Sequence, residues 1–353
     1  MITLTSGNLL ESSAEALVNT VNTVGIMGKG IALQFKKAFP DNFREYEAAC
    51  KAGVVRVGAM FITAPNRLHG PRYLINFPTK RHWKGKSRIQ DIEEGLKALT
   101  KDVQRLRIRS IAIPPLGCGL GGLPWPDVKS MIEAAFANLP GVQVFLYQPV
   151  GAPAAAAMPN RTTRPEMTKG RAAFLGILGR YCELLFEPCL SLLEVQKLCY
   201  FMQIAGEPLR LNYYKSFYGP YADNLRHVLN LLEGHYIVGW GDASNSPLTK
   251  IALLPGAFDE AMFYLDSCSD SKLRFERVAC LAEGYESAYG MELLATVHWL
   301  ATKEYAGDTC NAEEILEGVR SWTSRKSKLF KLQHIAIALK HLQSGCWLSS
   351  QTS

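Results

Sequence analysis

A lysine directly after an apolar strand is the group in this chain best placed to do chemistry. Lys80 follows an apolar run at residues 73–77 and precedes the run RHWK, residues 81–84. A protonated lysine can stabilise negative charge on a leaving group, and a neutral lysine can act as a nucleophile. Most basic runs of this kind are only solvated surface, so the role of Lys80 depends on what the fold places beside it.

Three glycine-containing turns follow predicted strands in the first part of the chain. They are SGNL at residues 6–9, a turn within VNTVNTVGIMGKGIALQFKKAFP at residues 18–40, and IPPLGCGLGGLPW at residues 113–125. Loops at the carboxyl ends of strands, and the helix N-termini that follow them, present unpaired N–H groups. Because glycine lets the backbone close tightly, these turns predict a site for an anionic ligand.

Two better-known glycine motifs do not fit these turns. The run GCGLGG at residues 117–122 matches the dinucleotide-binding pattern only superficially, since it follows a late strand and no acidic residue stands about 20 positions further on. The run GKG at residues 28–30 is not followed by the Ser or Thr with which a P-loop holds magnesium. The sequence therefore argues against a nucleoside triphosphatase.

Positive charge is concentrated in the first part of the chain. The 353 residues are enough for two domains and carry a net charge of +7. Residues 1–150 contain 19 Lys and Arg against 11 Asp and Glu, whereas residues 151–353 contain 20 against 21. This distribution favours a polyanionic ligand, such as a nucleotide or nucleic acid, for the first part.

The cysteines and the N-terminus bear on the cellular compartment. Nine cysteines are scattered without a C-x-x-C pair or a histidine at zinc-ligand spacing, so we expect reduced thiols, no metal and no cofactor. The N-terminus lacks the pattern of a leader, and no stretch approaches the roughly 18 apolar residues of a membrane span. We expect a cytoplasmic protein without a membrane partner.

Hydrophobic periodicity predicts an α/β domain at the start of the chain. Short β-rich runs alternate there with amphipathic helical stretches, the pattern of a central sheet covered by helices. The expected strands are residues 2–5, 16–19, 59–63, 73–77, 110–114 and 143–147, and the expected helices are residues 30–38, 43–52, 88–106 and 125–138.

A linker and a mainly α-helical domain are expected to follow. Residues 149–165, PVGAPAAAAMPNRTTRP, have Met158 as their one large apolar side chain and cannot build a core. The predicted domains are therefore residues 1–148 and 166–353. The expected helices of the second are residues 167–186, 192–204, 222–232, 271–281, 292–302, 313–322 and 328–342, with a β-prone piece at 235–240.

The first 148 residues resemble the macrodomain family, which binds ADP-ribose. The resemblance rests on asparagines at strand ends, Asn8, Asn19 and Asn22, and on the runs MGKGIALQFKKAFP and PPLGCGLGGLPW. It implies a mixed central sheet flanked by helices. The runs MGKGIA, TK at residues 79–80 and GCGL resemble the branch of this family that contains a terminal ADP-ribose glycohydrolase acting on proteins. Their combination with a helical domain is similar to the DNA ADP-ribosyl glycohydrolases that act as antitoxins to DarT-type toxins.

This resemblance implies roles for individual residues. Lys80 would be catalytic, and Asn22 would orient the distal ribose or a water molecule. The positions implied to contact ADP-ribose are Asn8, Leu9, Thr20, Val21, Asn22, Ile31, Ala32, Leu33, Gln34, Thr79, Gly117, Cys118, Gly119, Leu120 and Gly121.

Nucleic-acid contacts are expected beside Lys80. Trp83 can stack on a DNA base next to the modified nucleotide, or simply cover the edge of the sheet. The cations Arg81, Lys84, Lys86 and Arg88 are expected to contact phosphates, which would make DNA binding depend on salt.

One departure from the family pattern affects the mechanism. Relatives that act on proteins carry an acidic residue directly after GCGL, whereas this chain has Gly121. Two hypotheses for Lys80 stay open: its ammonium hydrogen-bonds a carbonyl oxygen of the departing base, or its neutral amine attacks the anomeric carbon and forms a transient adduct.

The second domain contains no glycine cradle, catalytic triad or metal-ligand cluster in its sequence. Residues 213–237 are rich in tyrosine, which is common in cores and at protein interfaces. The resemblance implies that this domain binds and blocks the toxin, and a purely stabilising or dimerising domain is the alternative.

We therefore expect a hydrolase that removes ADP-ribose from a base in single-stranded DNA and serves as an antitoxin. Thymine is the expected base, and guanine is the other candidate. Two alternatives are a non-catalytic ADP-ribose reader and a glycohydrolase that acts on modified proteins.

Overall fold

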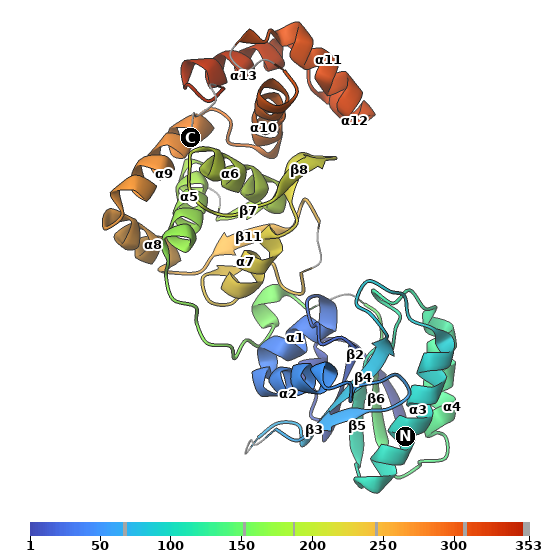
Figure 1. Cartoon of the computed structure of the whole chain (residues 1–353). Coiled ribbons are helices and arrows are strands. Elements are labelled where there is room, and N and C mark those ends of the chain that lie inside the picture. The colour runs from blue at the N-terminus through green and yellow to red at the C-terminus, as the bar shows by residue number, and fades with distance from the viewer. Residues whose placement is uncertain (66–68, 151–152, 186–187, 244–245, 306–308, 349–353) are drawn as a thin grey trace. The chain divides into compact units, whose positions relative to one another are not determined.

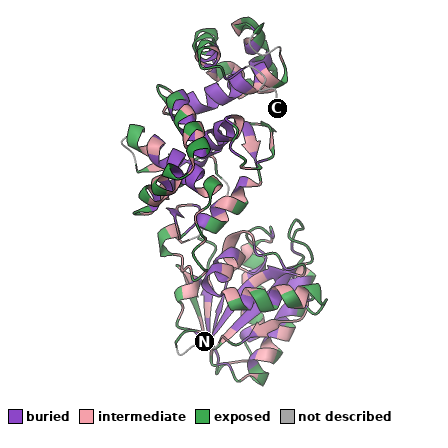
Figure 2. Cartoon of the chain, turned by 60° about the vertical axis from the view of Figure 1, so that its left-hand side comes forward, coloured by how far each residue is buried: buried purple, intermediate pink, exposed green. Residues whose placement is uncertain are grey.

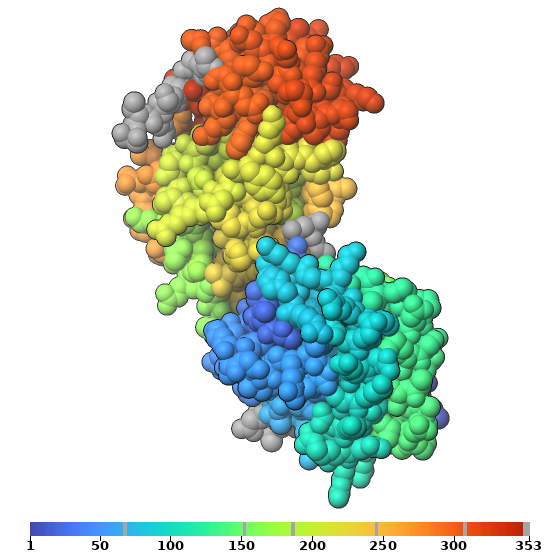
Figure 3. All heavy atoms as spheres, turned by 45° about the vertical axis from the view of Figure 1, so that its right-hand side comes forward, coloured from blue at the N-terminus to red at the C-terminus, as the bar shows by residue number. Residues whose placement is uncertain are grey.

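The structure is a computed structural model that describes the chain except residues 66–68, 151–152, 186–187, 244–245, 306–308 and 349–353 (Figure 1). It separates into two compact units, Met1–Thr163 with Gly241–Ser244, and Arg164–Trp240 with Asn245–Ser353. In the space-filling view the first unit runs mainly from blue to green, and the second from light green to red (Figure 3).

The first unit is built around a six-stranded sheet with the strand order β1-β6-β5-β2-β4-β3. All strand pairs are parallel except β3 with β4. The strands are β1 Ile2–Thr5, β2 Ala16–Asn22, β3 Phe61–Thr63, β4 Tyr73–Lys80, β5 Ser110–Ile113 and β6 Gln143–Tyr147, and the α-helices are α1 Gly30–Ala38, α2 Pro40–Lys51, α3 Ile89–Arg105 and α4 Trp125–Phe136. The predicted mixed sheet flanked by helices is confirmed.

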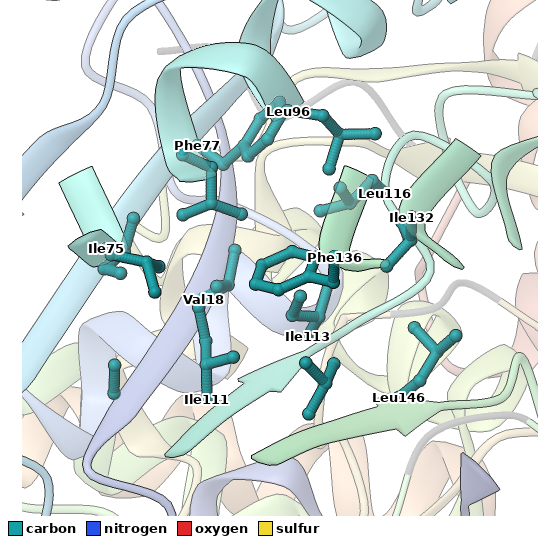
Figure 4. Packing of buried hydrophobic residues seen from close by; sticks show 14 of the residues in the cluster. Val18, Ile75, Phe77, Leu96, Ile111, Ile113, Leu116, Ile132, Phe136 and Leu146 are labelled. Atoms are coloured by element: carbon teal, nitrogen blue, oxygen red, sulfur yellow. The ribbon is translucent and has the colours of Figure 1, made fainter. Parts of the chain in front are cut away.

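Helices cover both faces of the sheet because its strands carry apolar side chains on both faces. Successive residues of a strand point to opposite faces. Val18 and Ile75 point to the face that carries α3 and α4, whereas Leu17 and Leu74 pack with Phe35 of α1 on the other face. Figure 4 shows the first cluster, in which Val18, Ile75, Phe77, Leu96, Ile111, Ile113, Leu116, Ile132, Phe136 and Leu146 are labelled. The strands are largely buried, while the outer faces of the helices are exposed (Figure 2).

Strand β4 is longer than the sequence predicts, and this fixes the position of Lys80. The expected end of this strand at residue 77 is wrong, because β4 continues through Pro78 to Lys80 and pairs with β2 up to Asn22, with a register shift between Val21 and Asn22. Proline is tolerated there because β3 begins only at Phe61, opposite Asn76, and so does not pair with the part of β4 beyond Asn76. Lys80 is thus held by a strand.

The second unit is mainly helical, as predicted. Its helices are α5 Lys169–Leu185, α6 Leu192–Ile204, α7 Leu225–Leu232, α8 Ala257–Asp266, α9 Ser269–Ala282, α10 Ala288–Lys303, α11 Ala312–Trp322, α12 Ser324–Leu329 and α13 Leu332–Ser344. Two small sheets accompany them: β10 Ile237–Val238, β11 Lys250–Leu253 and β7 Cys189–Ser191, and a hairpin of β8 Tyr213–Ser216 with β9 Gly219–Ala222. Helices α6 and α10 are buried on nearly all sides, so they form the centre of this unit.

Three expectations for the second unit are wrong in detail. The helix expected at 222–232 begins at Leu225, since the preceding residues form the β8–β9 hairpin. The helix expected at 328–342 is split, because Phe330 has an extended backbone and its buried ring packs edge-on against Tyr289 at 5.5 Å. Helix α8 was not expected. Among the described helices, none combines the length and the apolar composition needed to cross a bilayer.

Candidate active site

The carboxyl ends of the central parallel strands bring Lys80 and the 117–122 loop together. Lys80 stands opposite Asn22 of β2 in the ladder, and the loop follows β5, the neighbour of β2 on its other side. The Lys80 ammonium donates a hydrogen bond to the carbonyl oxygen of Leu120 at 2.5 Å. A basic side chain and a glycine-rich loop, 40 residues apart in sequence, therefore form one site.

Lys80 has no carboxylate partner within the described part of the chain. The nearby acid Asp91 is buried and paired with Arg81 at 2.8 Å. Partial burial lowers the pKa of Lys80 below its ordinary value. The side chain is half-buried, so it reaches solvent while its amine loses part of its hydration. This is a suitable setting for a lysine that contacts a substrate.

The 117–122 loop presents backbone N–H groups that can bind an anion. Gly117 and Gly122 have left-handed φ values of 70° and 79°, and Leu123 N donates to Gly117 O at 3.0 Å to close the loop. No acceptor among the described residues takes a hydrogen bond from the N–H groups of Gly119, Leu120 or Gly121. These three groups are available to phosphate oxygens.

Close packing around residue 121 leaves room only for glycine. A Cβ at this position would lie 2.1 Å from the carbonyl oxygen of Gly117 and 2.3 Å from the Ser87 hydroxyl. Ser87 N also donates to Gly121 O at 3.1 Å, so the loop rests directly on the residue before α3. No acidic side chain fits at 121 in this backbone, which gives a steric reason for the departure noted in the sequence. Ser87 is a site residue that sequence reasoning missed.

Asn22 shapes the neighbouring loop. Its amide Nδ2 donates to Ile26 O at 2.5 Å, and its Oδ1 accepts from Val24 N at 3.0 Å and Ile26 N at 3.3 Å. Tyr46 on α2 donates its hydroxyl to Asn22 O at 2.7 Å, a contact that the sequence did not predict. The Asn22 side chain thus holds the 22–26 turn in a defined conformation beside Lys80.

Of the remaining positions implied to contact ADP-ribose, some are accessible to solvent in the structure and others are buried. Thr20, Ile31, Ala32 and Cys118 are partly exposed, and Gly119 and Leu120 are exposed. Leu9, Val21, Leu33, Gln34 and Thr79 are buried, and Leu9 belongs to the core cluster of Phe35. Burial raises the pKa of the Cys118 thiol to about 11, so this thiol is not a nucleophile at neutral pH.

Asn8 lies apart from Lys80 and contacts the segment expected to be a linker. Its Oδ1 accepts from Leu10 N, and its Nδ2 donates to Ala157 O at 3.1 Å. Arg161 N donates to Lys37 O at 2.8 Å, so residues 155–161 pack on the first unit. Between them lies a cavity of about 260 Å³, lined by Leu10, Glu11, Ala38, Phe39, Ala156, Ala157, Met158, Pro159 and Arg161.

The basic run after β4 is open to solvent. Trp83 is 38% exposed, its ring centroid lies 5.6 Å from that of His82, and the Lys84 ammonium lies 5.0 Å from the Trp83 centroid. An exposed indole with a cation on its face is a surface on which a base can stack.

A buried hydrogen-bond network of amide side chains links β2, β3 and β4 to α2 near the site. Asn76 on β4 donates to Asn42 Oδ1 at 2.7 Å and accepts from Asn19 Nδ2 at 3.1 Å, and Thr63 donates to Asn42 at 2.8 Å. All four side chains are buried. In the part of the chain that the structure describes, no group of three or more His, Cys, Asp or Glu could hold a metal ion.

Comparison with known proteins places this chain in a family. The Macro domain model matches residues 18–132. The DNA ADP-ribosyl glycohydrolase of Thermus aquaticus is 48% identical over 97% of this chain and 93% of its own length. The macrodomain of Mycobacterium tuberculosis DarG is 52% identical, with a TM-score of 0.42, over 42% of this chain and 98% of its own.

A third relative joins two activities in one chain. It is a DNA ADP-ribosyl transferase-DNA ADP-ribosyl glycohydrolase fusion protein of Thermosipho africanus, 34% identical over 41% of this chain and 42% of its own length. The identity to the Thermus aquaticus protein extends through both units described above. This chain belongs to the DNA ADP-ribosyl glycohydrolase family of macrodomain proteins.

Proposed function

We propose that this chain hydrolyses the bond between ADP-ribose and a thymine base in single-stranded DNA. The observation that carries the proposal is the Lys80 ammonium beside a loop with three unengaged backbone N–H groups. In the proposed complex the diphosphate binds to those N–H groups, which places the distal ribose next to Lys80. The modified base then lies towards the exposed Trp83 and the cations around it.

The reaction exchanges one bond for another and needs no redox partner. The bond from the anomeric carbon to the base nitrogen breaks, water oxygen bonds to that carbon, and the proton from water ends on the base. In the first route Lys80 hydrogen-bonds a base carbonyl as negative charge develops there. In the second route neutral Lys80 attacks the anomeric carbon, and water then hydrolyses the adduct.

Two features favour DNA over protein as the substrate. The backbone at Gly121 has no room for the acidic side chain that protein-directed relatives carry at that place. The basic run from Arg81 to Lys86 is open to solvent and includes an indole on which a base can stack. A non-catalytic reader would need neither a desolvated lysine nor such a surface.

We further propose that the second unit binds a DNA ADP-ribosyltransferase of the DarT type, so that the chain acts as an antitoxin. The fusion of both activities in the Thermosipho africanus relative supports a link between the two enzymes. Cytoplasmic localisation follows from this partnership and stays a prediction.

The decisive experiment measures release of ADP-ribose from a single-stranded oligonucleotide that carries ADP-ribosylated thymine. We expect wild type to turn over and Lys80→Ala to lose at least about 100-fold in rate, while ADP-ribose still binds in calorimetry. Lys101→Ala, an exposed lysine on α3, is the matched control. A Lys80→Ala variant as active as wild type would contradict the assignment.

The same assay separates the alternatives. Wild type that binds ADP-ribose but releases none from DNA bearing modified thymine or guanine, or from modified protein, would be a reader. Release from modified protein alone would make it a protein glycohydrolase. Mass spectrometry of acid-quenched reactions distinguishes the two roles of Lys80, since only the nucleophilic route leaves ADP-ribose on the peptide that contains Lys80.

A further inference from the structure

The second unit contains a buried lysine that borders a cavity and forms no ion pair with a carboxylate of the described residues. Lys197 on α6 is 1% exposed, and its ammonium donates to the carbonyl oxygen of Pro220 on β9 at 2.6 Å. An ammonium group has three N–H donors. Among the described residues, Pro220 is the one acceptor of a hydrogen bond from this group, so two donors lack a protein partner.

The one carboxylate nearby is already engaged by other cations. Glu292 on α10 accepts from Lys326 at 2.5 Å and from Arg325 at 2.7 and 3.0 Å. Lys326 is fully buried as well. Burial and the neighbouring Lys326 charge lower the pKa of Lys197 to about 7. When Lys197 is protonated, the cluster has three cations and one anion, an imbalance that is costly inside a protein.

The cavity beside Lys197 has the size and lining for a small acidic group. Its volume is about 150 Å³, and its lining residues are Leu192, Leu193, Gln196, Lys197, Ser216, Tyr218, Tyr221, Ser246 and Pro247. A water molecule takes up about 30 Å³, so a carboxylate side chain fits. Phe217 and Leu248, next to lining residues in sequence, are 49% and 75% exposed. Exposed aromatic and aliphatic side chains that gather around a pocket are typical of a protein interaction site.

We propose that this Lys197 cavity receives an aspartate or glutamate side chain of the transferase toxin. The unbalanced positive charge selects a carboxylate, and the exposed aromatic and aliphatic groups beside it favour a protein as its source. The proposal rests on the proposed binding of the toxin by the second unit, and it adds the residues and the chemistry of that contact.

The first test compares toxin binding by full-length wild type and Lys197→Met. We expect Lys197→Met to weaken binding of a catalytically inactive toxin by at least about 30-fold, as loss of one partner of a buried charge pair does. Its DNA glycohydrolase activity should not change. Lys340→Met, an exposed lysine on α13, should bind the toxin like wild type.

A pH series distinguishes a charge contact from a structural role. Wild-type affinity should fall as pH rises above about 7, where the free enzyme loses the Lys197 charge. The groups facing Lys197 from the packed elements are Lys326, Arg325, Glu292, Tyr218 and Tyr221, and all of them remain in Lys197→Met. The difference in pH dependence between the two proteins therefore reports Lys197 itself.

A second variant decides the case in which Lys197→Met does not fold. Ser216→Glu would supply a carboxylate from within the chain, because Ser216 lines the cavity and its backbone oxygen already accepts a hydrogen bond from Trp322 Nε1. We expect this variant to melt at a higher temperature and to lose toxin binding. Toxin binding that is equal to wild type in Lys197→Met or Ser216→Glu would overturn the cavity proposal alone. Absence of binding by wild type would overturn the proposed toxin partnership as well.

Discussion

The two units of this protein place their ionisable groups differently. In the first unit Lys80 stands at a strand end in contact with solvent, and the buried polar groups around that site are the neutral amides of Asn19, Asn42 and Asn76 and the carboxylate of Asp91, which is paired with Arg81. In the second unit Lys197, Lys326 and Glu292 are all buried. Burying a neutral amide costs little once it is hydrogen-bonded, whereas a buried charge needs a counter-ion. The first arrangement suits a site open to a substrate, and the second suits a contact completed by a partner.

The largest expected effect concerns the buried anion of the second unit. Glu292→Gln leaves Lys326 and Arg325 without their carboxylate, so we expect about 3–5 kcal/mol less stability against urea unfolding. Glu93→Gln on α3 breaks an exposed pair with Lys97 and should cost less than about 1 kcal/mol. Equal losses of unfolding free energy in the two variants would contradict the expected difference between the buried charges of the second unit and the exposed charges of the first.

A second prediction tests the packed loop of the first unit. Gly121→Ala should lower the rate of ADP-ribose release about 100-fold, because the new Cβ must displace the Gly117 carbonyl from its place in the loop. Gly119→Ala is the matched control, since a Cβ there would have no neighbour within 4 Å. Gly121→Asp should lose activity as well. A gain of activity on modified protein in Gly121→Asp would show that chemistry, and not packing, decides this position.

A third prediction concerns acid sensitivity of the second unit. His298 is buried, contacts Tyr200 Oη through Nδ1 at 2.8 Å, and contacts Trp347 O through Nε2 at 3.0 Å. Burial lowers its pKa to about 4. Between that value and the unfolded pKa of about 6.5 the unfolded chain binds more protons, so stability falls as pH drops through this window.

We expect His298 to lower the free energy of unfolding by roughly 1–3 kcal/mol as pH drops through that window. Urea unfolding followed by tryptophan fluorescence at several pH values measures this free energy. In His298→Gln the free energy of unfolding should fall less over the same pH window, by this amount. His227→Gln, at an exposed position on α7, should match wild type. The same slope in His298→Gln and wild type would contradict the prediction.

The smallest expected effect concerns the solvent-exposed cations of the first unit. Lys84→Gln should weaken binding of single-stranded DNA a few-fold and reduce the slope of log affinity against log salt by about 1. Affinity for free ADP-ribose should stay unchanged, because the loop of Gly117–Gly121 is untouched. An unchanged salt slope would mean that Lys84 is ordinary solvated surface.

The sequence predicted the elements of the first unit well, because alternating and 3.6-residue apolar patterns describe strands and helices that pack on one sheet. It placed α1 at Gly30–Ala38 and β1 at Ile2–Thr5, and it identified GCGL as a loop after a strand. It predicted less of the second unit. The β8–β9 hairpin is short and its tyrosines resemble a helical pattern, so residues 213–222 were not predicted as strands.

By itself the sequence determined the α/β and helical parts, the basic surface of the first part and the glycine turns, since these depend on local spacing and composition. Only the tertiary structure decided which side chains became neighbours. It extended β4 through Pro78 to Lys80, set Ser87 against Gly121, and buried Lys197 beside a cavity with no ion pair in the described part of the chain. These features arise from contacts between residues far apart in the chain, which local patterns do not encode.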